Sequence, residues 1–314
     1  MDEMPERING LHHITAVSGP PHLNYDFYTR VLGLRFTKKT INFDDPYTYH
    51  LYYGNYEATP GSSITFFPWQ GVPQGIPNTG EATVVSYATP KNSLDFWREH
   101  FAKNDVEILP HENRFGDKQI RVKDSEGMII EVVESTGIDE IKPKETDGIP
   151  AELAIRGFFG TTLSLADTGR TAELLREFGW KETNKESDIT RYVSEPENHL
   201  GAVIDLKKEP NLRGRFGRGS VHHIAFRVPD DESQLAWRDK LIDLGFNPTP
   251  VQNRQYFRSV YFREPGGVLF EIATDIPGFT KDEDLETLGT ELKLPPWYED
   301  HRQDIENRLP PLEV

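Results

Sequence analysis

The sequence has no cysteine among its 314 residues. This absence excludes disulfides, thiolate metal ligands and cysteine nucleophiles, so any metal must be held by His, Asp, Glu or water. No apolar run approaches the ~18 residues that a membrane helix needs. The first residues, MDEMPERING, are polar and acidic, which is not typical of a secretion signal. We therefore expect a cytoplasmic protein without a membrane partner.

Positive charge is also scarce. The chain has 35 Lys and Arg against 51 Asp and Glu, which gives a formal net charge of −16. The negative electrostatic field of such a chain repels nucleic acid, and no basic stretch is dense enough to override this repulsion. We expect a small uncharged or weakly charged partner instead. A homo-oligomer is allowed by the composition but not required by it.

One short pattern occurs twice, as GLHHITAV at residues 10–17 and GSVHHIAF at residues 219–226. Histidine is unusual in an apolar strand, because its ring nitrogens need partners away from water. Each copy is followed by a helical pattern and then by alternating strand patterns. The same order starts at TVVSYATP and at GFFGTTLSLAD. The chain therefore consists mainly of four β-α-β-β-β modules.

These repeats predict an α+β fold in which the four modules form two curved, open, mixed sheets. We expect a first domain at 8–136, a linker at 137–151 around the charged stretch IKPKETDGIPAE, and a second domain at 152–275. The acidic tail, 276–314, contains LPPW and a helix-like YEDHRQDIENRL. We expect this tail to pack on the body, or to cover one mouth of the site.

The modules can be compared with one another inside the chain. At the first-strand position they carry His13, Val84, Gly160 and His223, and at the last-strand position Phe66, Glu131, Asp205 and Glu271. Modules one and four thus supply His13, His223 and Glu271. Two imidazoles and one carboxylate form the facial arrangement that binds Fe(II) or Mn(II) with open positions for other ligands. The pattern predicts that modules one and four share a metal-bearing cleft.

Strand alternation limits each histidine pair to one ligand, because neighbouring side chains point to opposite faces. The residues alone leave His12 or His13, and His222 or His223, as alternatives. They also leave open a site between modules three and four, in which His13 would be structural.

Other polar residues of the modules have a plainer interpretation. Glu131 and Asp205 have no histidine partners in their modules, so we interpret them as relics of the repeat or as polar core partners. His50, in YTYHLYYG, is expected to be a satisfied core histidine.

Several segments together carry a family resemblance: GLHHITAVSG, YHLYYGNYEATPGSSITFFP, GSVHHIAF, NRQYFRSVYFREPGGVLFEIATD and GFTKDEDLETLGTELKLPPW. They resemble the ring-cleaving dioxygenases of the vicinal oxygen chelate (glyoxalase, bleomycin resistance, dioxygenase) superfamily, and among these the hydroquinone 1,2-dioxygenases. The likeness covers nearly the whole chain. It implies an extradiol-type dioxygenase that uses Fe(II), with Mn(II) as the alternative, and that acts on a hydroquinone-like aromatic with O2. A purified sample can also carry adventitious zinc.

The resemblance also implies roles for individual residues. It assigns the metal to His13, His223 and Glu271. It places further residues around the substrate, namely His12, His222, Thr15, Arg254 and Tyr261. In this interpretation His12 or His222 accepts the phenol proton as a general base, whereas Tyr261 and Arg254 donate hydrogen bonds to the developing negative charge.

Two other functions fit the same fold. A glyoxalase-like lyase or isomerase uses its metal as a Lewis acid and usually has a fourth protein ligand, often a carboxylate. The position that we match to this ligand in module one is Phe66, which disfavours that function. A small-molecule binding protein without metal chemistry is disfavoured because all three ligands are retained.

Overall fold

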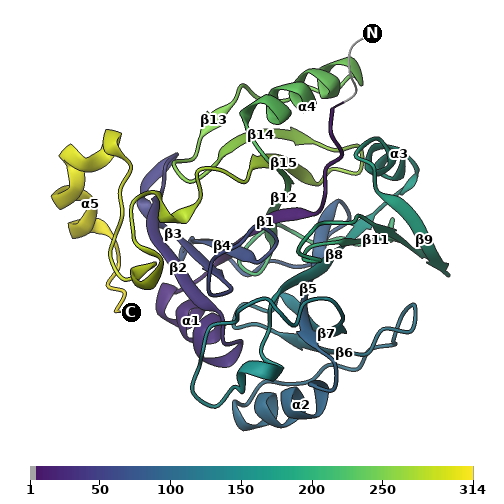
Figure 1. Cartoon of the computed structure of the whole chain (residues 1–314), viewed down its shortest axis with the longest axis horizontal. Coiled ribbons are helices and arrows are strands. Elements are labelled where there is room, and N and C mark those ends of the chain that lie inside the picture. The colour runs from purple at the N-terminus through teal and green to yellow at the C-terminus, as the bar shows by residue number, and fades with distance from the viewer. Residues whose placement is uncertain (1–4, 314) are drawn as a thin grey trace.

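The computed structural model describes residues 5–313 of the chain (Figure 1). Modules one and four form one eight-stranded sheet with the strand order β13-β14-β15-β12-β1-β4-β3-β2. Module one contains β1 (Leu11–Ser18), α1 (Pro21–Asp26), the π-helix η1 (Phe27–Val31), β2 (Arg35–Asn42), β3 (Asp45–Gly54) and β4 (Ser63–Pro68). Module four contains β12 (Val221–Val228), α4 (Asp231–Asp243), β13 (Gln252–Asn253), β14 (Arg258–Arg263) and β15 (Leu269–Thr274).

Modules two and three form a seven-stranded sheet with the order β6-β7-β5-β8-β11-β10-β9. Module two contains β5 (Glu81–Pro90), α2 (Leu94–Lys103), β6 (Gln119–Lys123) and β7 (Ile129–Ser135). Module three contains β8 (Gly157–Leu165), α3 (Gly169–Glu177), β9 (Lys181–Glu186), β10 (Ile189–Val193) and β11 (Val203–Lys208), and the short 3-10 helix η2 (Ala151–Leu153) precedes it. In module two the strand expected after the helix is reduced to an isolated bridge between Ile108 and Val122.

Each sheet joins one module from each half of the sequence. In the eight-stranded sheet the junction is the antiparallel pair of first strands, β1 and β12, which places Thr15 opposite His223. In the seven-stranded sheet β5 and β8 pair in the same way. These junctions confirm the α+β fold of two curved mixed sheets, whereas the predicted domain boundaries stay a prediction.

The strand β1 shows why the two histidine pairs sit in the interior. All eight of its residues, LHHITAVS, are buried, and β-branched Ile14, Thr15 and Val17 suit a pleated strand. A strand in the middle of a sheet with both faces covered has no solvent side. Any polar side chain on β1 must therefore find its partners inside the protein.

The C-terminal segment covers the β2 edge of the eight-stranded sheet. It contains the 3-10 helices η3 (Phe279–Lys281), η4 (Leu285–Thr287) and η5 (Pro296–His301), followed by α5 (Arg302–Arg308). Leu292 forms a bridge with Lys39 of β2, and the fully buried ammonium of Lys38 lies 2.7 Å from the Asp282 carboxylate. In Figure 1 this segment, in yellow, lies beside β2 and β3. Covering an edge strand removes unpaired backbone groups that would otherwise pair with another chain.

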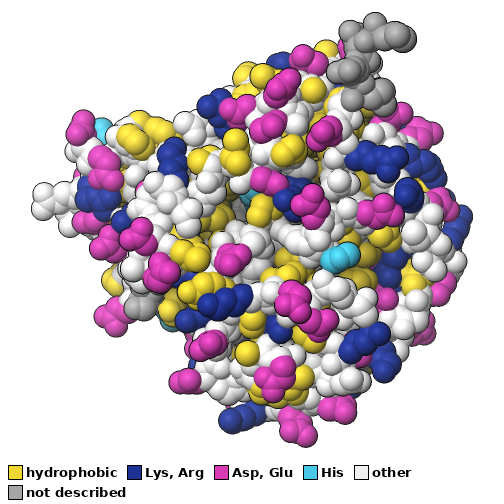
Figure 2. Space-filling model, viewed as in Figure 1, with side chains coloured by type: hydrophobic (Ala, Val, Ile, Leu, Met, Phe, Trp, Pro, Cys, Tyr) yellow, Lys and Arg dark blue, Asp and Glu magenta, His cyan; other side chains and the backbone are white. Residues whose placement is uncertain are grey.

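The surface matches the acidic composition. On the face shown in Figure 2, acidic side chains are spread over the whole surface and basic side chains form smaller groups among them. No helix within residues 5–313 is long and apolar enough to span a membrane.

Candidate metal centre and adjoining cavity

Three adjacent strands bring His13, His223 and Glu271 together. His13 of β1 and Glu271 of β15 both lie opposite Ala225 of the intervening strand β12. Directly paired residues point to the same face, and His223 reaches that face because it is two residues from Ala225. The methyl group of Ala225 leaves space between the three longer side chains. The strand register thus selects the second histidine of each pair.

The three side chains converge closely. Their ligand atoms lie within 4.8 Å of one another, and all three residues are buried. The Nε2 atoms of His13 and His223 are 3.3 Å apart. Oε2 of Glu271 lies 3.3 Å from the first of these nitrogens and 3.0 Å from the second. Modules one and four therefore form a cluster with two imidazoles and one carboxylate, as their sequences predict.

The donor set fits a divalent cation. Oε2 of Glu271 is fully buried and accepts no well-formed hydrogen bond, although buried polar atoms rarely lack a partner. Burial raises the pKa of Glu271, but the facing His13 and His223 outweigh it and hold that pKa well below its usual range. Burial also lowers the pKa of His223. A divalent cation would give Oε2 of Glu271 the partner that it lacks, and neutral imidazoles could coordinate the same ion.

The first histidine of each pair supports the second. Nδ1 of His12 lies 2.9 Å from Nδ1 of His13, and the corresponding distance between His222 and His223 is 2.8 Å. A ligand histidine that directs the Nε2 lone pair at a metal carries its proton on Nδ1. That N–H donates to the neighbouring Nδ1, so His12 and His222 then hold their own protons on Nε2. Ser259 similarly donates its hydroxyl to Oε1 of Glu271.

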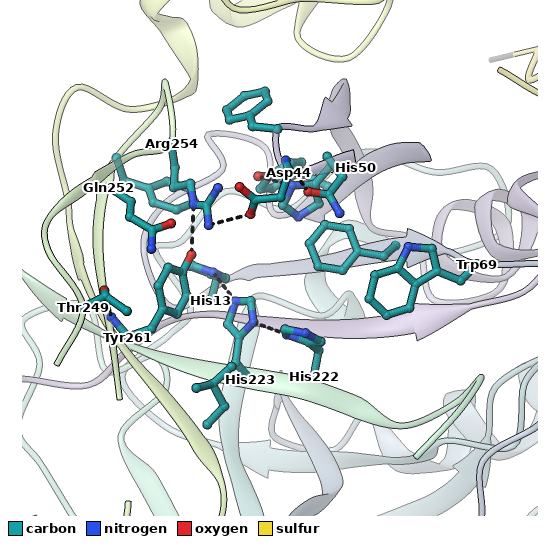
Figure 3. A pocket seen from close by; sticks show the side chains of 16 residues that line it. His13, Asp44, His50, Trp69, His222, His223, Thr249, Gln252, Arg254 and Tyr261 are labelled. Carbon is teal, nitrogen blue, oxygen red and sulfur yellow. Dashed lines mark hydrogen bonds and ion pairs between the residues drawn. The ribbon is translucent and has the colours of Figure 1, made fainter. Parts of the chain in front are cut away.

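A cavity of about 410 Å³ opens above His13 and His223. Figure 3 shows the polar wall, with Tyr261, Arg254 and Gln252, facing His50 and Trp69. Aromatic rings predominate on the second wall, which includes Phe67 and Trp69, stacked with ring centroids 5.4 Å apart. A concave site with apolar aromatic surface and a few convergent polar groups suits a small aromatic ligand.

The polar wall is held together by Arg254. Its Nε donates to the Tyr261 hydroxyl oxygen at 3.2 Å, and its Nη2 lies 2.9 Å from Oδ2 of Asp44. Burial, followed by the charge of Glu271, raises the pKa of Tyr261, so the phenol stays protonated at neutral pH. Its hydrogen is free to be donated into the cavity, because the oxygen already accepts from Arg254.

His222 also lines the cavity. Burial and, after it, the neighbouring His223 lower the pKa of His222 to about 3, so its ring is neutral at pH 7. With Nδ1 turned toward His223, only Nε2 is left to contact a ligand.

Two residues that the resemblance places around the substrate are not among those lining the cavity, namely His12 and Thr15. The fully buried Thr15 shares a hydrogen bond of 2.8 Å with Thr65. Thr65 in turn bonds Nε2 of His50 at 2.8 Å, and Nδ1 of His50 bonds the Tyr52 hydroxyl at 2.9 Å. Both ring nitrogens of His50 are satisfied, as expected, but the expectation of a core position is wrong, because His50 lines the cavity.

The match of Phe66 to Glu271 is also wrong by one residue. Glu271 pairs with Ala225, two residues after His223, and the same relation in module one pairs Thr65 with Thr15, two residues after His13. A slip of one residue moves a side chain to the opposite face, so the matching position is Thr65. It carries a hydroxyl and no carboxylate, so the cluster has no fourth acidic ligand there.

In the seven-stranded sheet the corresponding acids are ion-paired. Glu131 accepts hydrogen bonds from Arg114 and Arg121, and Asp205 accepts from Arg114 and Arg191. Arg121 lies opposite Glu131 in the register, just as Tyr261 lies opposite Glu271. Glu131 and Asp205 are therefore polar core partners, and guanidinium groups occupy the place of a metal.

Several cavity residues have no counterpart in the sequence analysis: Asn42, Phe43, Asp44, Tyr52, Phe67, Trp69, Thr249, Gln252, Phe257 and Leu269. Most of them lie outside the positions that repeat between modules. The clearest available signal was the aromatic run ITFFPW after the third strand of module one.

Comparison with known proteins agrees with this fold. The model of the Glyoxalase/Bleomycin resistance protein/Dioxygenase superfamily matches residues 10–132 and 140–272. A crystal structure from Bacillus subtilis, described as a "putative dioxygenase", superposes with a TM-score of 0.94 at 46% identity, over 98% of this chain and 99% of that one. Glyoxalase I from Zea mays shares the fold, with a TM-score of 0.61 at 14% identity, over 85% of this chain and 92% of that one.

Two curated relatives cover nearly the full length. The Bacillus subtilis protein named "Putative ring-cleaving dioxygenase MhqO" is 46% identical over 312 residues, which is 99% of each chain. A chlorohydroquinone/hydroquinone 1,2-dioxygenase from Sphingobium indicum is 34% identical over 313 residues, or 97% of each chain. Because the family model matches both halves of the chain, this chain belongs to the Glyoxalase/Bleomycin resistance protein/Dioxygenase superfamily.

Proposed function

We propose that this protein is a mononuclear non-haem Fe(II) dioxygenase that opens the aromatic ring of hydroquinone-type phenols with O2, in an extradiol-type reaction. The observation that carries the proposal is the convergence of His13, His223 and Glu271 beside a cavity with aromatic walls. Two imidazoles and one carboxylate are the ligand set of non-haem Fe(II) oxygenases. The names of the full-length relatives support a ring-cleaving activity.

His13, His223 and Glu271 would hold the metal. Iron(II), when bound, supplies open positions for a phenolate and O2 and the electrons that activate O2. The outer hydrogen bonds from Ser259 to Glu271 and between the paired histidines fix the orientation of these ligands. Such supporting contacts strengthen metal binding because the ligands lose little freedom when the ion enters.

The cavity walls would bind and orient the ring. Phe67 and Trp69 supply an apolar surface that excludes water and contacts the faces or edges of a phenol. On the opposite wall Tyr261 can donate its hydroxyl hydrogen to an oxygen that gains negative charge, and the Arg254 guanidinium stabilises the same charge.

His222 is assigned a different role from the one expected from sequence. Its Nδ1 accepts the hydrogen bond from His223, so Nε2 carries a hydrogen and donates into the cavity. A donor at this position would hold a substrate oxygen or O2 rather than accept the phenol proton. His12 does not line the cavity itself; its ring contacts His13 and Phe257, which do, and it supports the orientation of His13.

The lyase alternative is less well supported. Its usual fourth ligand would stand at Thr65, whose hydroxyl is hydrogen-bonded to Thr15 and His50. A neutral hydroxyl held in this way is a poor substitute for a second carboxylate.

The test is oxygen uptake after anaerobic reconstitution with Fe(II). Hydroquinone, methylhydroquinone and catechol are added in turn to the wild type, to His13→Ala and to a control variant, His301→Ala, whose ring is exposed on the C-terminal segment. We expect one O2 per hydroquinone for the wild type and the control. Loss of a residue that only supports a metal ligand typically lowers metal affinity or activity about 10–100-fold. The rate of oxygen uptake by His13→Ala should therefore fall by at least that factor. No uptake with any phenol by an iron-loaded wild type would refute the proposal.

A further inference from the structure

The mouth of the cavity lies where the two edges of the eight-stranded sheet approach each other. Asp44 belongs to the two-residue turn between β2, one edge strand, and β3. Arg254 directly follows β13, the other edge strand. Their side chains meet with Nη2 of Arg254 2.9 Å from Oδ2 of Asp44, and Figure 3 shows this contact. One ion pair therefore links the two edges of the sheet across the cavity.

The turn that carries Asp44 is held from outside by the C-terminal segment. The Tyr298 hydroxyl donates to the carbonyl oxygen of Phe43 at 3.0 Å, and the ring of Trp297 contacts the ring of Phe43 with centroids 5.5 Å apart. Farther along the hairpin, Tyr47 donates its hydroxyl hydrogen to Asp304 at 3.0 Å. Although the Asp44 side chain is 71% exposed, its backbone is fixed at the mouth by these contacts.

The pair decides the charge of the cavity wall. Among the described residues that line the cavity, Arg254 is the only Lys or Arg and Asp44 is the only Asp or Glu. The carboxylate of Asp44 thus occupies the guanidinium edge that would otherwise bind an anion from the ligand. An anionic ring substituent on this side would meet either the Asp44 charge or an arginine that is already paired.

We propose that Asp44 is a specificity-determining residue: it makes the cavity accept hydroquinones with uncharged ring substituents and reject those that carry a ring-borne carboxylate. This inference rests on the proposed function, since it presupposes that hydroquinones bind in this cavity. Arg254 alone would be a natural carboxylate clamp, because guanidinium and carboxylate groups match in a two-pronged geometry. Asp44 blocks that use of Arg254 and leaves its Nε directed at Tyr261.

The test measures binding rather than turnover. Fe(II)-loaded protein is titrated by calorimetry without O2, with methylhydroquinone and with 2,5-dihydroxyphenylacetate, for the wild type and for Asp44→Asn. The control is Asp45→Asn, which removes the same charge one residue away, where the carboxylate bonds Thr48 and does not line the cavity. Any direct contact of the carboxylate with the metal is common to all variants and cancels in their comparison.

We expect the wild type and the control to prefer methylhydroquinone. Asp44→Asn should gain about tenfold or more in affinity for the carboxylated phenol, which is the effect of one added charge-assisted hydrogen bond. The double variant Asp44→Asn, Arg254→Met should lose that gain, and Asp44→Glu should restore the wild-type preference.

Two results would overturn the inference in distinguishable ways. If the wild type binds methylhydroquinone but Asp44→Asn gains no affinity for the carboxylated phenol, Asp44 does not determine specificity and the proposed function stands. If neither phenol binds to the wild type, the proposed function fails, and this inference fails with it.

Discussion

Replacing Glu131 by Gln is expected to lower the free energy of unfolding by about 3 kcal/mol at pH 7. The Glu131 side chain is fully buried and bonded to Arg114, Arg121 and Ser86. Burial raises its pKa, but Arg114 and then Arg121 outweigh burial and lower the pKa to about 2, from an ordinary value of 4.5. At about 1.4 kcal/mol per pKa unit, the ionised group stabilises the fold by about 3 kcal/mol. Loss of one partner from a buried ion pair costs a similar ~3–5 kcal/mol.

Urea unfolding at pH 7 and at pH 3 provides the assay. Because the pKa of Glu131 is depressed in the folded state, its contribution is complete above the unfolded pKa and is lost as pH falls toward about 2. The gap between wild type and variant should therefore narrow to about 1 kcal/mol at pH 3. As a control, Glu182→Gln removes a surface pair with Arg176 and should cost under about 1 kcal/mol. A gap below 1 kcal/mol at pH 7, or one that acid does not narrow, would refute this account of the buried network.

Three further predictions concern the metal and other buried charges. A divalent metal at about 100 times its Kd should stabilise the wild type by about 2.7 kcal/mol in thermal unfolding, and His223→Ala should show no such shift. Burial raises the pKa of Asp124 from 3.8 to about 6, so between about pH 4 and 6 the folded state binds more protons than the unfolded state. The free energy of unfolding should therefore fall as pH rises from about 4 to 6, and urea titrations of Asp124→Asn should lack this slope. Lys38→Met leaves Asp282 and Glu283 without their buried cation and should lower the free energy of unfolding in urea by about 3–5 kcal/mol; a loss under about 1 kcal/mol would contradict this account.

The repeats were enough to predict the fold and the convergence of His13, His223 and Glu271. Equivalent positions in the four modules single out His13, His223 and Glu271, because only modules one and four carry histidine at the first-strand position and, of these two, only module four adds a carboxylate at the last-strand position. The choice within each histidine pair could not be made from the residues. It depends on the pairing of His13 and Glu271 with Ala225, and only the register of the three strands fixes that pairing.

The error at Phe66 has a related cause. All six residues of β4, SITFFP, are buried, so no alternation of polar and apolar residues marks which face is which. Only the pairing of Thr15 with Thr65 establishes the register, and that pairing is invisible in the sequence.

The cavity walls were harder to predict than the candidate metal ligands. Asp44 lies in a hairpin turn, Trp69 follows β4, and Gln252 belongs to a two-residue edge strand. These segments have no common spacing, and they meet only because the sheet curves until its edges approach each other. The position of His50 in the cavity lining was missed for the same reason, because the sequence pattern of a strand histidine is the same whether its ring faces a core or a cavity.

The two sheets show how one fold provides for a buried carboxylate in two ways. In the seven-stranded sheet Glu131 lies opposite Arg121, and its charge is satisfied by cations that belong to the chain. In the eight-stranded sheet the residue opposite Glu271 is Tyr261, which is neutral, and Oε2 of Glu271 has no hydrogen-bond partner. A buried charge needs a compensating one, so this second position calls for a cation from outside the chain. The same comparison explains why the cavity adjoins Glu271. An arginine in place of Tyr261, bonded to Glu271 as Arg121 is to Glu131, would fill the space that a metal and its ligands require.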